Sequence, residues 1–425
     1  MSIGKLYKAN STIIQDAIRK AKESGFSSLS DFEIRELAKI VAQASKIFKS
    51  EIEFGNKKLG YDEYIHLLVR ATGLPKKYAV SAVKELLYAI KNIKTAIKNL
   101  LPFNFNKNKN IVLTPRGRVL SAILPSNLPT PNFFWLLSIP FRYPVVIRPS
   151  SFEPFTSYRM LKSLYYVDLP LDCSYFVPCE NKLVPEIVFN SDLSLLFGSQ
   201  ETISEYQNYK NVKIYGPGNS KILIDSDYYN IDDIFERVRK SMLDKGGRSC
   251  LNASQVFVCG ENAERLLKDL YFSLKETLPN HFDDPIEDTA EIPAFPEKEK
   301  AKKIASFLKQ AINEDILVEV NDMTFLKPTV VLCEKYISSL FVELPFPYLA
   351  MTAVQKERVE KFLENSLVVS VFTEDQTLLK NLILNPTIKN VFLQTSTTDT
   401  DLLNPHEGNL AFFLCDFKSV QKRKN

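Results

Sequence analysis

The stretch that decides the fold reads Gly246-Gly247-Arg248-Ser249-Cys250-Leu251-Asn252-Ala253-Ser254-Gln255-Val256-Phe257-Val258. A glycine pair and an arginine lead to a cysteine, and an apolar run typical of a buried strand follows. A cysteine reacts as its thiolate, and the positive charge of Arg248 favours that form. A polar loop that enters a buried strand also holds a nucleophile rigidly. Cys250 is therefore a candidate nucleophile, although most cysteines are small core residues.

The composition indicates a globular chain of two or three domains. It has 425 residues, of which 45% are hydrophobic and 24% charged. The net charge of +4, from 54 basic and 50 acidic residues, is too balanced to predict nucleic acid binding. The longest apolar run, Phe133–Phe141, is interrupted by Ser138 and Pro140. It is far shorter than the roughly 18 to 20 residues that span a bilayer, so we expect no membrane span.

The cysteines and histidines argue against a metal centre and against a disulfide framework. Six cysteines are present without a Cys-x-x-Cys pair, and there are three histidines. This pattern does not predict a structural zinc site. A chain of this length does not need disulfides for stability, which indicates a reducing compartment. No charged and apolar leader opens the sequence, so we expect a cytoplasmic protein.

Residues 1–101 are expected to be helical. Ser30 and Glu33 have the spacing of a capping box, and apolar residues at helical spacing follow them. A second long helix is expected from Pro75 to about Leu100, since no glycine or proline interrupts that segment.

From residue 111 onward, short strands alternate with helices. The expected strands are Ile111–Thr114, Val119–Leu124, Val145–Ile147, Leu193–Phe197, Val212–Tyr215, Ile222–Ile224, Val256–Val258, Ile316–Val320, Thr329–Leu332, Val368–Phe372 and Asn390–Leu393. The expected helices are Phe155–Tyr165, Ile231–Leu243, Ala263–Thr277 and one that ends near Ile312. This alternation predicts an α/β fold with mostly parallel sheets covered by helices on both faces. The first sheet is expected to end near Asp225–Asp233.

Three polar segments follow predicted strands of the first half. Asn127 lies between Pro125 and Pro129, and its amide suits an oxyanion, although asparagine is also common in turns. Arg148 ends a buried strand, where α/β sheets bind ligands, and arginine suits phosphate; a surface arginine is the alternative. Gly198 and Ser199 run from a strand into a helix, whose N-terminus attracts phosphate, but one glycine is weak evidence.

The order and spacing of these segments resemble the aldehyde dehydrogenase superfamily over roughly residues 110–350. Asn127 falls on the oxyanion asparagine of its Pro-Trp-Asn-Phe-Pro motif, and Cys250 falls on the cysteine of Gly-Gln-x-Cys. The other matches are Arg148-Pro149-Ser150 on Lys-Pro-Ser, Phe197-Gly198-Ser199 on Phe-Thr-Gly-Ser, Pro328-Thr329-Val330 on Pro-Thr-Val, and Glu343 on the ribose-binding glutamate of Glu-Ile-Phe-Gly-Pro.

The resemblance implies two open, twisted α/β sheets, preceded by an N-terminal helical region. The implied domains are residues 1–225 for the helices and the nicotinamide-binding part, 226–405 for the catalytic part with Cys250, and 406–425 for a C-terminal tail. It implies Asn127 and Cys250 as catalytic residues. The implied cofactor contacts are Arg148, Ser150, Gly198, Ser199 and Glu343.

Departures from the family pattern point to a subgroup. Hydrolytic members carry a glutamate two residues before their Gly-Gly turn, and Ile214 stands there in this sequence. An apolar side chain cannot activate water. Within the superfamily the sequence resembles most the fatty acyl-CoA reductases of the bioluminescence type. The segments that carry this closer resemblance are Arg148-Pro149-Ser150-Ser151-Phe152-Glu153-Pro154, Cys250-Leu251-Asn252-Ala253-Ser254-Gln255 and His406-Glu407-Gly408.

The closer resemblance implies a reductase that forms an acyl thioester on Cys250, releases coenzyme A and reduces the thioester to a long-chain aldehyde. An arginine beside the ribose suits a 2′-phosphate, which favours NADPH over NADH. The closer resemblance also implies an acyl-CoA or acyl-carrier substrate, an acyl-transfer partner enzyme and a homo-oligomer. Residues 133–137 are expected either to line an acyl tunnel or to form helix core. His406 is expected either at the mouth of the site or in an ordinary turn.

Three other functions stay open at this point. One is a hydrolytic, NAD-dependent aldehyde dehydrogenase, and another is an acyl-phosphate reductase with the same thioester chemistry. The third is an inactive scaffold that keeps the fold for binding. The product formed from an aldehyde and the reactivity of Cys250 distinguish these functions.

Overall fold

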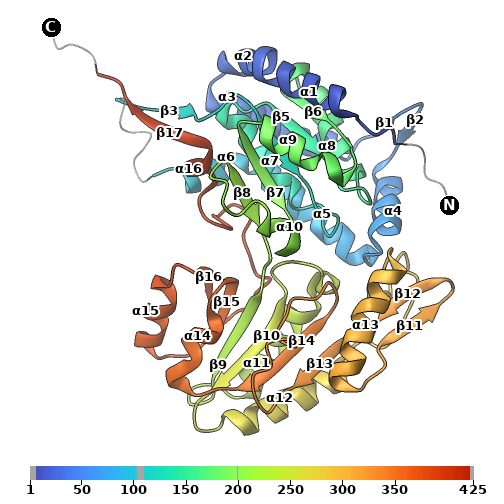
Figure 1. Ribbon diagram of the computed structural model, residues 1–425, viewed down its shortest axis with the longest axis vertical. Coiled ribbons are helices and arrows are strands. Elements are labelled where there is room, and N and C mark those ends of the chain that lie inside the picture. The colour runs from blue at the N-terminus through green and yellow to red at the C-terminus, as the bar shows by residue number, and fades with distance from the viewer. Residues whose placement is uncertain (1–5, 103–109, 199, 422–425) are drawn as a thin grey trace. The chain divides into compact units, whose positions relative to one another are not determined.

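The computed structural model describes residues 6–102, 110–198 and 200–421. The chain divides into two compact units (Figure 1). The first comprises Met1–Leu68, Val80–Tyr215 and Asp401–Asn425, and the second comprises Val69–Ala79 and Gly216–Thr400. Within the described ranges, no helix combines the length and the apolar character that crossing a membrane requires.

The N-terminal region is mainly helical but contains a short hairpin that the sequence did not predict. Its helices are α1 Ser11–Lys20, α2 Phe26–Ser30, α3 Ile34–Ile47, α4 Tyr61–Thr72, α5 Lys76–Lys91 and α6 Ile93–Leu100. Strands β1 (Ile52–Phe54) and β2 (Lys57–Leu59) pair around Gly55, which has a φ of 59°. Three-residue strands are too short to show the alternation that identifies a strand.

Two expectations for these helices are wrong in detail. Ser30 ends α2, and the capping box at the start of α3 is formed by Glu33 and Glu36. The long helix after Pro75 is divided at Asn92, whose side-chain amide donates to the carbonyl oxygen of Tyr88 at 2.8 Å. An asparagine side chain that competes for backbone groups ends a helix without glycine or proline.

The first unit is built on a five-stranded parallel sheet in the order β6-β5-β4-β7-β8. The strands are β4 Leu120–Ile123, β5 Val145–Arg148, β6 Ser174–Phe176, β7 Leu193–Phe197 and β8 Val212–Tyr215. The helices between them are α7 Asn132–Ser138, α8 Phe155–Tyr165, α9 Val184–Asn190 and α10 Gln200–Ser204. Strand β4 is buried at every position, as expected for a strand covered on both faces.

The direction of the connections reverses at the centre of this sheet. From β4 the chain moves outward to β5 and β6, and it then returns to β7 on the other side of β4 and continues to β8. Such a reversal leaves a crevice at the carboxyl ends of the two central strands, where α/β sheets bind ligands. Asn127 follows β4 and Gly198 follows β7.

Strand β3 (Ile111–Pro115) does not join this sheet. It pairs antiparallel with β17 (Cys415–Ser419), and Figure 1 shows the two strands side by side. Strands β3 and β4, which are consecutive in the chain, therefore do not pair with each other. The residues expected to form a tail instead contain α16 (Leu410–Leu414) and β17. A strand partner 300 residues away cannot be identified from local sequence, because pairing depends on the fold of the whole unit.

The second unit contains a six-stranded parallel sheet in the order β13-β14-β10-β9-β15-β16. The strands are β9 Ser220–Asp225, β10 Ala253–Cys259, β13 Thr329–Leu332, β14 Tyr348–Ala353, β15 Ser366–Phe372 and β16 Ile388–Leu393. The hairpin of β11 (Leu317–Val320) and β12 (Met323–Leu326) forms a separate small sheet. The sequence did not predict β12 and β14.

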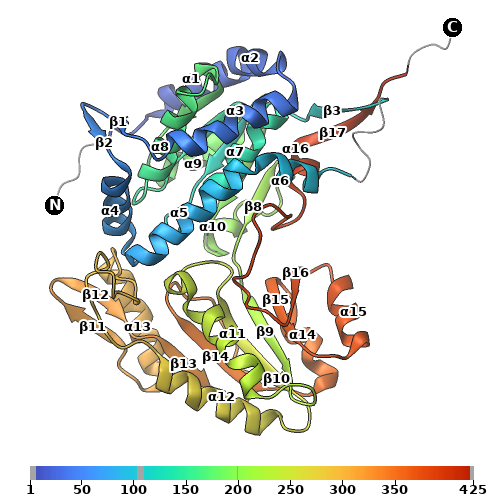
Figure 2. The same ribbon diagram turned by 180° about the vertical axis from the view of Figure 1, so that it is seen from behind.

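Helices cover both faces of this second sheet (Figure 2). They are α11 Ile231–Leu243 and α12 Ala263–Thr277 on one face, and α13 Lys298–Ile312, α14 Val359–Leu363 and α15 Gln376–Leu384 on the other. Ile222 and Ile224 pack towards α11 and α12, whereas Leu223 packs towards α13, α14 and α15. Because successive side chains of β9 point to opposite faces of the sheet, this strand contributes to the apolar core on both faces.

The division into units differs from the ranges 1–225, 226–405 and 406–425. Strand β9 was expected to end the first sheet, but it pairs with β10 and β15 at the centre of the second. The main segment of the second unit therefore runs from Gly216 to Thr400, and Val69–Ala79 joins it. Buried strands of similar composition do not reveal which sheet they join.

Candidate active site

Cys250 lies at the amino edge of the second sheet, in the loop that precedes β10. Ala253 of β10 pairs with Ser220 of β9, so the loops before these two strands meet. The hydroxyl of Ser220 donates to the carbonyl oxygen of Cys250 at 2.9 Å. The expectation of a polar loop that enters a buried strand is confirmed, because β10 is buried at every position.

The glycine pair gives the loop its shape. Gly246 and Gly247 have φ values of 64° and 66°, a conformation that suits glycine. A Cβ atom on Gly247 would lie 2.4 Å from the backbone nitrogen of Pro347, so no side chain fits there. The two glycines therefore allow the loop before Cys250 to turn tightly against the segment around Pro347.

Gly218, in the turn before β9, contacts the loop that carries Cys250. A Cβ atom on Gly218 would lie 1.9 Å from the carbonyl oxygen of Cys250. The carbonyl oxygen of Gly218 accepts a hydrogen bond from Leu367 N at 2.7 Å. The close contact between Gly218 and the Cys250 carbonyl is between two backbone segments, which cannot yield as a side chain can. The position of Cys250 therefore depends on glycine at residue 218.

Asn252 is a structural anchor that sequence reasoning did not identify. Its side-chain oxygen accepts from Ser249 N at 2.8 Å, and its amide donates to the carbonyl oxygens of Ser241 at 3.0 Å and Asp244 at 2.9 Å. These bonds connect the end of α11 to the loop around Cys250. Asn252 is the buried polar residue just before the strand, which is a signal for such an anchor.

Arg248 anchors the same loop on its other side. Its guanidinium donates to the carbonyl oxygens of Thr72 and Ala294, the latter at 2.6 Å, and lies 5.1 Å from the centre of the Phe295 ring. Burial lowers the pKa of this guanidinium to about 10, so it stays charged at neutral pH. The structure thus assigns Arg248 a packing role, and its effect on the thiol stays a prediction.

Cys250 differs from the other five cysteines in exposure. Cys173, Cys179, Cys259, Cys333 and Cys415 are buried, whereas Cys250 is partly exposed. Burial raises the pKa of Cys173, Cys259 and Cys415 to about 12, so these thiols stay protonated. Thiolate chemistry needs a thiol that solvent and substrate reach, and among the cysteines Cys250 satisfies that requirement best.

Glu343 lies beside the Gly218 turn within the same unit. Its carboxylate accepts from Asn219 N at 2.8 Å and from the backbone of Gly218. Burial raises the pKa of Glu343, and the backbone donors oppose that rise. The structure therefore brings Glu343 and Cys250 to opposite sides of one short turn.

In the first unit, Asn127 and Arg148 lie at the carboxyl edge of neighbouring strands. Ile123 pairs with Arg148 in the register of β4 and β5, and Leu124 N donates to the carbonyl oxygen of Arg148 at 3.0 Å. Asn127 follows β4 by four residues and is partly exposed. Asn127 belongs to the first unit and Cys250 to the second.

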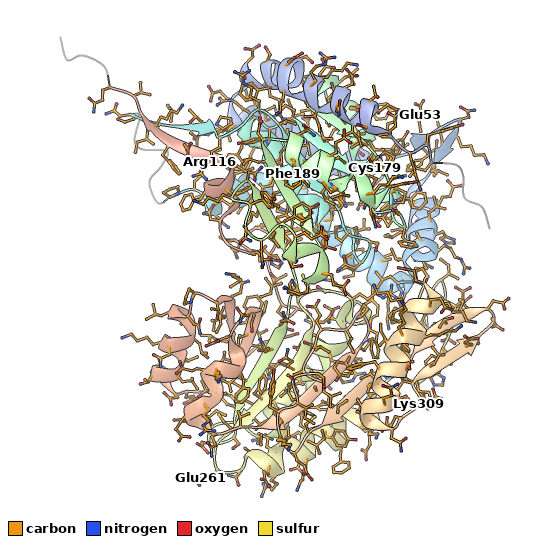
Figure 3. All side chains as sticks on the ribbon, in the orientation of Figure 1. Glu53, Arg116, Cys179, Phe189, Glu261 and Lys309 are labelled. Atoms are coloured by element: carbon orange, nitrogen blue, oxygen red, sulfur yellow. The ribbon has the colours of Figure 1, made fainter. Side chains whose placement is uncertain are left out.

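Arg148 is buried, which excludes the alternative of a surface arginine. Its guanidinium donates to the side chain of Asn181 at 2.6 Å and to the carbonyl oxygen of Cys179 (labelled in Figure 3) at 3.3 Å. The buried Nε atom of Arg148 has no hydrogen-bond partner among the described residues. Ser150, also buried, accepts from Phe152 N at 3.2 Å.

Gly198 follows β7 and precedes the short helix α10. Its amide donates to the carbonyl oxygen of Tyr215 at 3.4 Å, and a Cβ atom there would lie 3.0 Å from Cβ of Thr202 in α10. The predicted contact at Ser199 lies outside the described residues. Gly198 thus follows β7, Asn127 follows β4, and Arg148 is the last residue of β5. These three strands are adjacent in the sheet.

The end of β8 carries no carboxylate on either face. Ile214 packs against the apolar core below α1 and α9, whereas Tyr215 stacks on the Phe197 ring at 4.5 Å. No aspartate or glutamate occurs between Glu205 and Asp225. No residue of this segment therefore supplies a carboxylate, whichever of them is aligned with the family's glutamate.

His406 packs against Phe134 of α7 with the ring centres 5.9 Å apart. Burial, with a contribution from the Lys213 ammonium, lowers the pKa of His406 to about 4. The imidazole is therefore neutral at neutral pH. His406, Phe133, Phe134, Leu137 and Tyr215 line a small cavity of about 10 Å³.

The model of the aldehyde dehydrogenase family matches residues 1–408. The chain belongs to that family. Aldehyde dehydrogenases are oxidoreductases that act on the aldehyde group, and the two α/β sheets described above are consistent with their cofactor and catalytic domains. No curated protein sequence matches this chain significantly.

Solved aldehyde dehydrogenases share the fold over almost the whole chain. Aldehyde dehydrogenase 21 from Physcomitrella patens, solved with the product succinate, is 18% identical, with a TM-score of 0.79, covering 97% of this chain and 91% of its own. Glyceraldehyde-3-phosphate dehydrogenase from Methanocaldococcus jannaschii, solved with NADP, is 16% identical, with a TM-score of 0.78 and coverages of 99% and 96%. Indole-3-acetaldehyde dehydrogenase from P. syringae, solved with NAD+, is 15% identical, with a TM-score of 0.83 and coverages of 98% and 90%.

Proposed function

We propose that this member of the family is an acyl-CoA reductase, related to the fatty acyl-CoA reductases of the bioluminescence type. The observation that carries the proposal is the stretch from residue 206 to 224, which contains no carboxylate where hydrolytic relatives activate water. No residue of this stretch then serves as a general base that directs water at an acyl group on Cys250. Such an acyl-enzyme persists long enough to be reduced.

The chain's own residues account for the transfer of the acyl group. The Cys250 thiolate attacks the carbonyl carbon of an acyl-CoA, a carbon–sulfur bond forms, and coenzyme A leaves as its thiolate. The Asn127 amide and the Cys250 backbone N–H are proposed to stabilise the oxyanion. Anchoring by Ser220, Asn252 and Gly218 keeps the Cys250 loop rigid, so little reorganisation is needed during attack.

The residues at the carboxyl edge of the first sheet fit a nicotinamide cofactor. The strand order reverses between β4 and β7, which is where α/β sheets generally bind ligands, and Arg148 retains a buried Nε donor without a partner among the described residues. Arg148, Ser150, Gly198, Ser199 and Glu343 are the proposed contacts, and the arginine favours NADPH over NADH. When bound, the reduced cofactor supplies the hydride that converts the thioester into an aldehyde.

The acyl chain is proposed to lie beside α7, near residues 133–137. These side chains are buried, as both the tunnel and the helix-core interpretations require. The adjoining cavity of about 10 Å³ holds roughly one water molecule, so a long chain must displace neighbouring side chains. A homo-oligomer, an acyl-transfer partner enzyme and a cytoplasmic location stay predictions of the sequence resemblance.

The proposal is tested by supplying the purified protein with a series of acyl-CoAs and either NADPH or NADH. We expect cofactor oxidation, release of coenzyme A and formation of aldehyde. Cys250→Ser should abolish the reaction, whereas Cys259→Ser, at a buried cysteine, should retain most of it. Acid formed from aldehyde at a rate independent of coenzyme A would overturn the proposal, and an unreactive Cys250 would favour the inactive scaffold.

A gain of function tests the missing carboxylate directly. Tyr215→Glu and Ile214→Glu place a carboxylate on either face of the end of β8, and Ile214→Gln and Tyr215→Gln are the uncharged controls. We expect one glutamate variant to release free acid from acyl-CoA, as in hydrolytic relatives. Acid release by the unmodified protein at the same rate would show that water reaches the acyl-enzyme without this carboxylate.

A further inference from the structure

Glu343 is connected to the nucleophile through two backbone contacts. Its carboxylate accepts from Asn219 N at 2.8 Å and from the backbone of Gly218. On the other side of this turn, Gly218 packs against the Cys250 carbonyl so closely that a Cβ atom would lie 1.9 Å from its oxygen. The turn is therefore held between the carboxylate and the loop of the nucleophile.

Two further hydrogen bonds hold the same turn and the Cys250 loop in place. Ser220, the residue after Asn219, donates its hydroxyl to the same Cys250 carbonyl at 2.9 Å. Leu367 N donates to the Gly218 carbonyl at 2.7 Å. If the Glu343 acceptor is removed, the amides of residues 218 and 219 lose their partner and the turn is no longer fixed on that side.

We propose that Glu343 is a positioning residue for Cys250: by holding the turn of residues 218 and 219, it fixes the backbone on which the thiol is presented. This inference rests on the proposed role of Cys250 as the nucleophile. It assigns the carboxylate a task that precedes cofactor binding and differs from a ribose contact. An oxygen acceptor suffices for this task, so glutamine should replace glutamate.

The test measures Cys250 alkylation by iodoacetamide between pH 6 and 10, with neither cofactor nor acyl-CoA present. Peptide mass spectrometry separates Cys250 from the five buried cysteines. The variants are Glu343→Ala, Glu343→Gln and Glu343→Asp, and Glu334→Ala is the control because Glu334 is an exposed residue of the same connecting segment. Thermal unfolding of each variant shows whether it is folded.

We expect Glu343→Ala to change the alkylation rate at least fivefold and to shift its pH midpoint. Glu343→Gln should stay within twofold of the unmodified protein, and Glu334→Ala should match it. If Glu343→Ala does not fold, Glu343→Asp, whose shorter side chain loses contact with Asn219 N, should show the same change. Unaltered alkylation in all folded variants, together with a raised KM for the cofactor, would overturn the inference and leave a ribose contact.

The outcomes separate this inference from the proposed function. If Cys250 of the unmodified protein does not react at any pH in this range, the nucleophile assignment fails, and the inference fails with it. If Cys250 reacts and acyl-CoA is reduced while the Glu343 variants alkylate normally, only the inference fails.

Discussion

At the scale of single residues, the candidate site depends on backbone contacts that tolerate no added atoms. Gly218 and Gly247 each lie against backbone atoms of another segment, at 1.9 Å and 2.4 Å from an added Cβ. These contacts fix the loop of Cys250 while its side chain stays partly exposed, which suits the nucleophile role that we propose. The position of this thiol therefore depends on the two neighbouring glycines.

Gly218→Ala should therefore impair the reaction more than it impairs folding. The added methyl displaces the Cys250 carbonyl, and a displacement near 1 Å at a reacting group costs about a hundredfold in rate. The measurement is kcat/KM for acyl-CoA reduction, with the far-ultraviolet circular dichroism spectrum as a check on folding. Gly60→Ala is the matched control, since its Cβ would meet only Glu63 Oε2, at 3.6 Å; equal activity of both variants would contradict the steric argument.

At the scale of elements, buried polar side chains determine how helices meet strands. Asn252 connects the end of α11 to the loop before β10. Glu153 accepts from Thr156 N at 2.7 Å at the start of α8, in a position with 4% exposure. Asn252 directly precedes β10, and Glu153 lies two residues before α8. Whether each side chain is buried depends on residues that are distant in the chain.

Asn252→Ala should lower the free energy of unfolding by at least about 3 kcal/mol. The substitution leaves Ser249 N and two helix-end carbonyls buried without their side-chain partner, and each such loss costs about 1 to 3 kcal/mol. Urea denaturation measures the change. Asn190→Ala, which removes one exposed hydrogen bond to the Glu186 carbonyl, should cost little; similar losses in both variants would contradict the anchoring role.

Glu153 should make stability fall as the pH rises from about 4.5 to 7. Burial raises the pKa of Glu153 from 4.5 to about 7, so over this range the unfolded chain ionises while the folded protein keeps the proton. Stability that is present below pH 4.5 is lost by pH 7, and the loss is about 3 kcal/mol. Denaturation curves at several pH values measure it.

Glu153→Gln keeps the acceptor for Thr156 N and cannot ionise. The difference in unfolding free energy between this variant and the unmodified protein should therefore change by about 3 kcal/mol across the same interval. A constant difference would show that Glu153 titrates normally in the folded protein.

At the scale of the whole molecule, each unit is assembled from segments that are distant in the chain. Residues 401–425 belong to the first unit, and residues 69–79 belong to the second. The side chains of Arg70, Lys76 and Lys77 form ion pairs with Asp284, Asp288 and Glu291 within the second unit. Neither unit is therefore a continuous stretch of sequence.

Deletion of residues 415–425 should destabilise the first unit selectively. It removes the β17 partner of β3 and the ion pair between Arg116 and Asp416. A loss of about 2 kcal/mol lowers the Tm of a unit this size by roughly 4 to 8 °C. Calorimetry should show this shift in one transition, and deletion of residues 422–425 alone is the control; an unshifted transition would contradict a stabilising role of β17.

The sequence by itself determined the family, the alternation of strands and helices, and Cys250 as the candidate nucleophile. The family follows from the resemblance of its motifs to a known family, and the elements follow from periodicity; neither depends on distant contacts. The ends of α8, α11, α12 and β13 agree with their predicted ranges for the same reason.

The tertiary structure decided what depends on non-local pairing. It assigned β9 to the second sheet, paired β3 with β17, buried Arg148 and placed Glu343 behind the Gly218 turn. Burial and hydrogen-bond partners come from residues far apart in the chain, and no local pattern encodes them. The stretch around Cys250 therefore indicates a reactive thiol, while its neighbours from Gly218 to Leu367 show how that thiol is held.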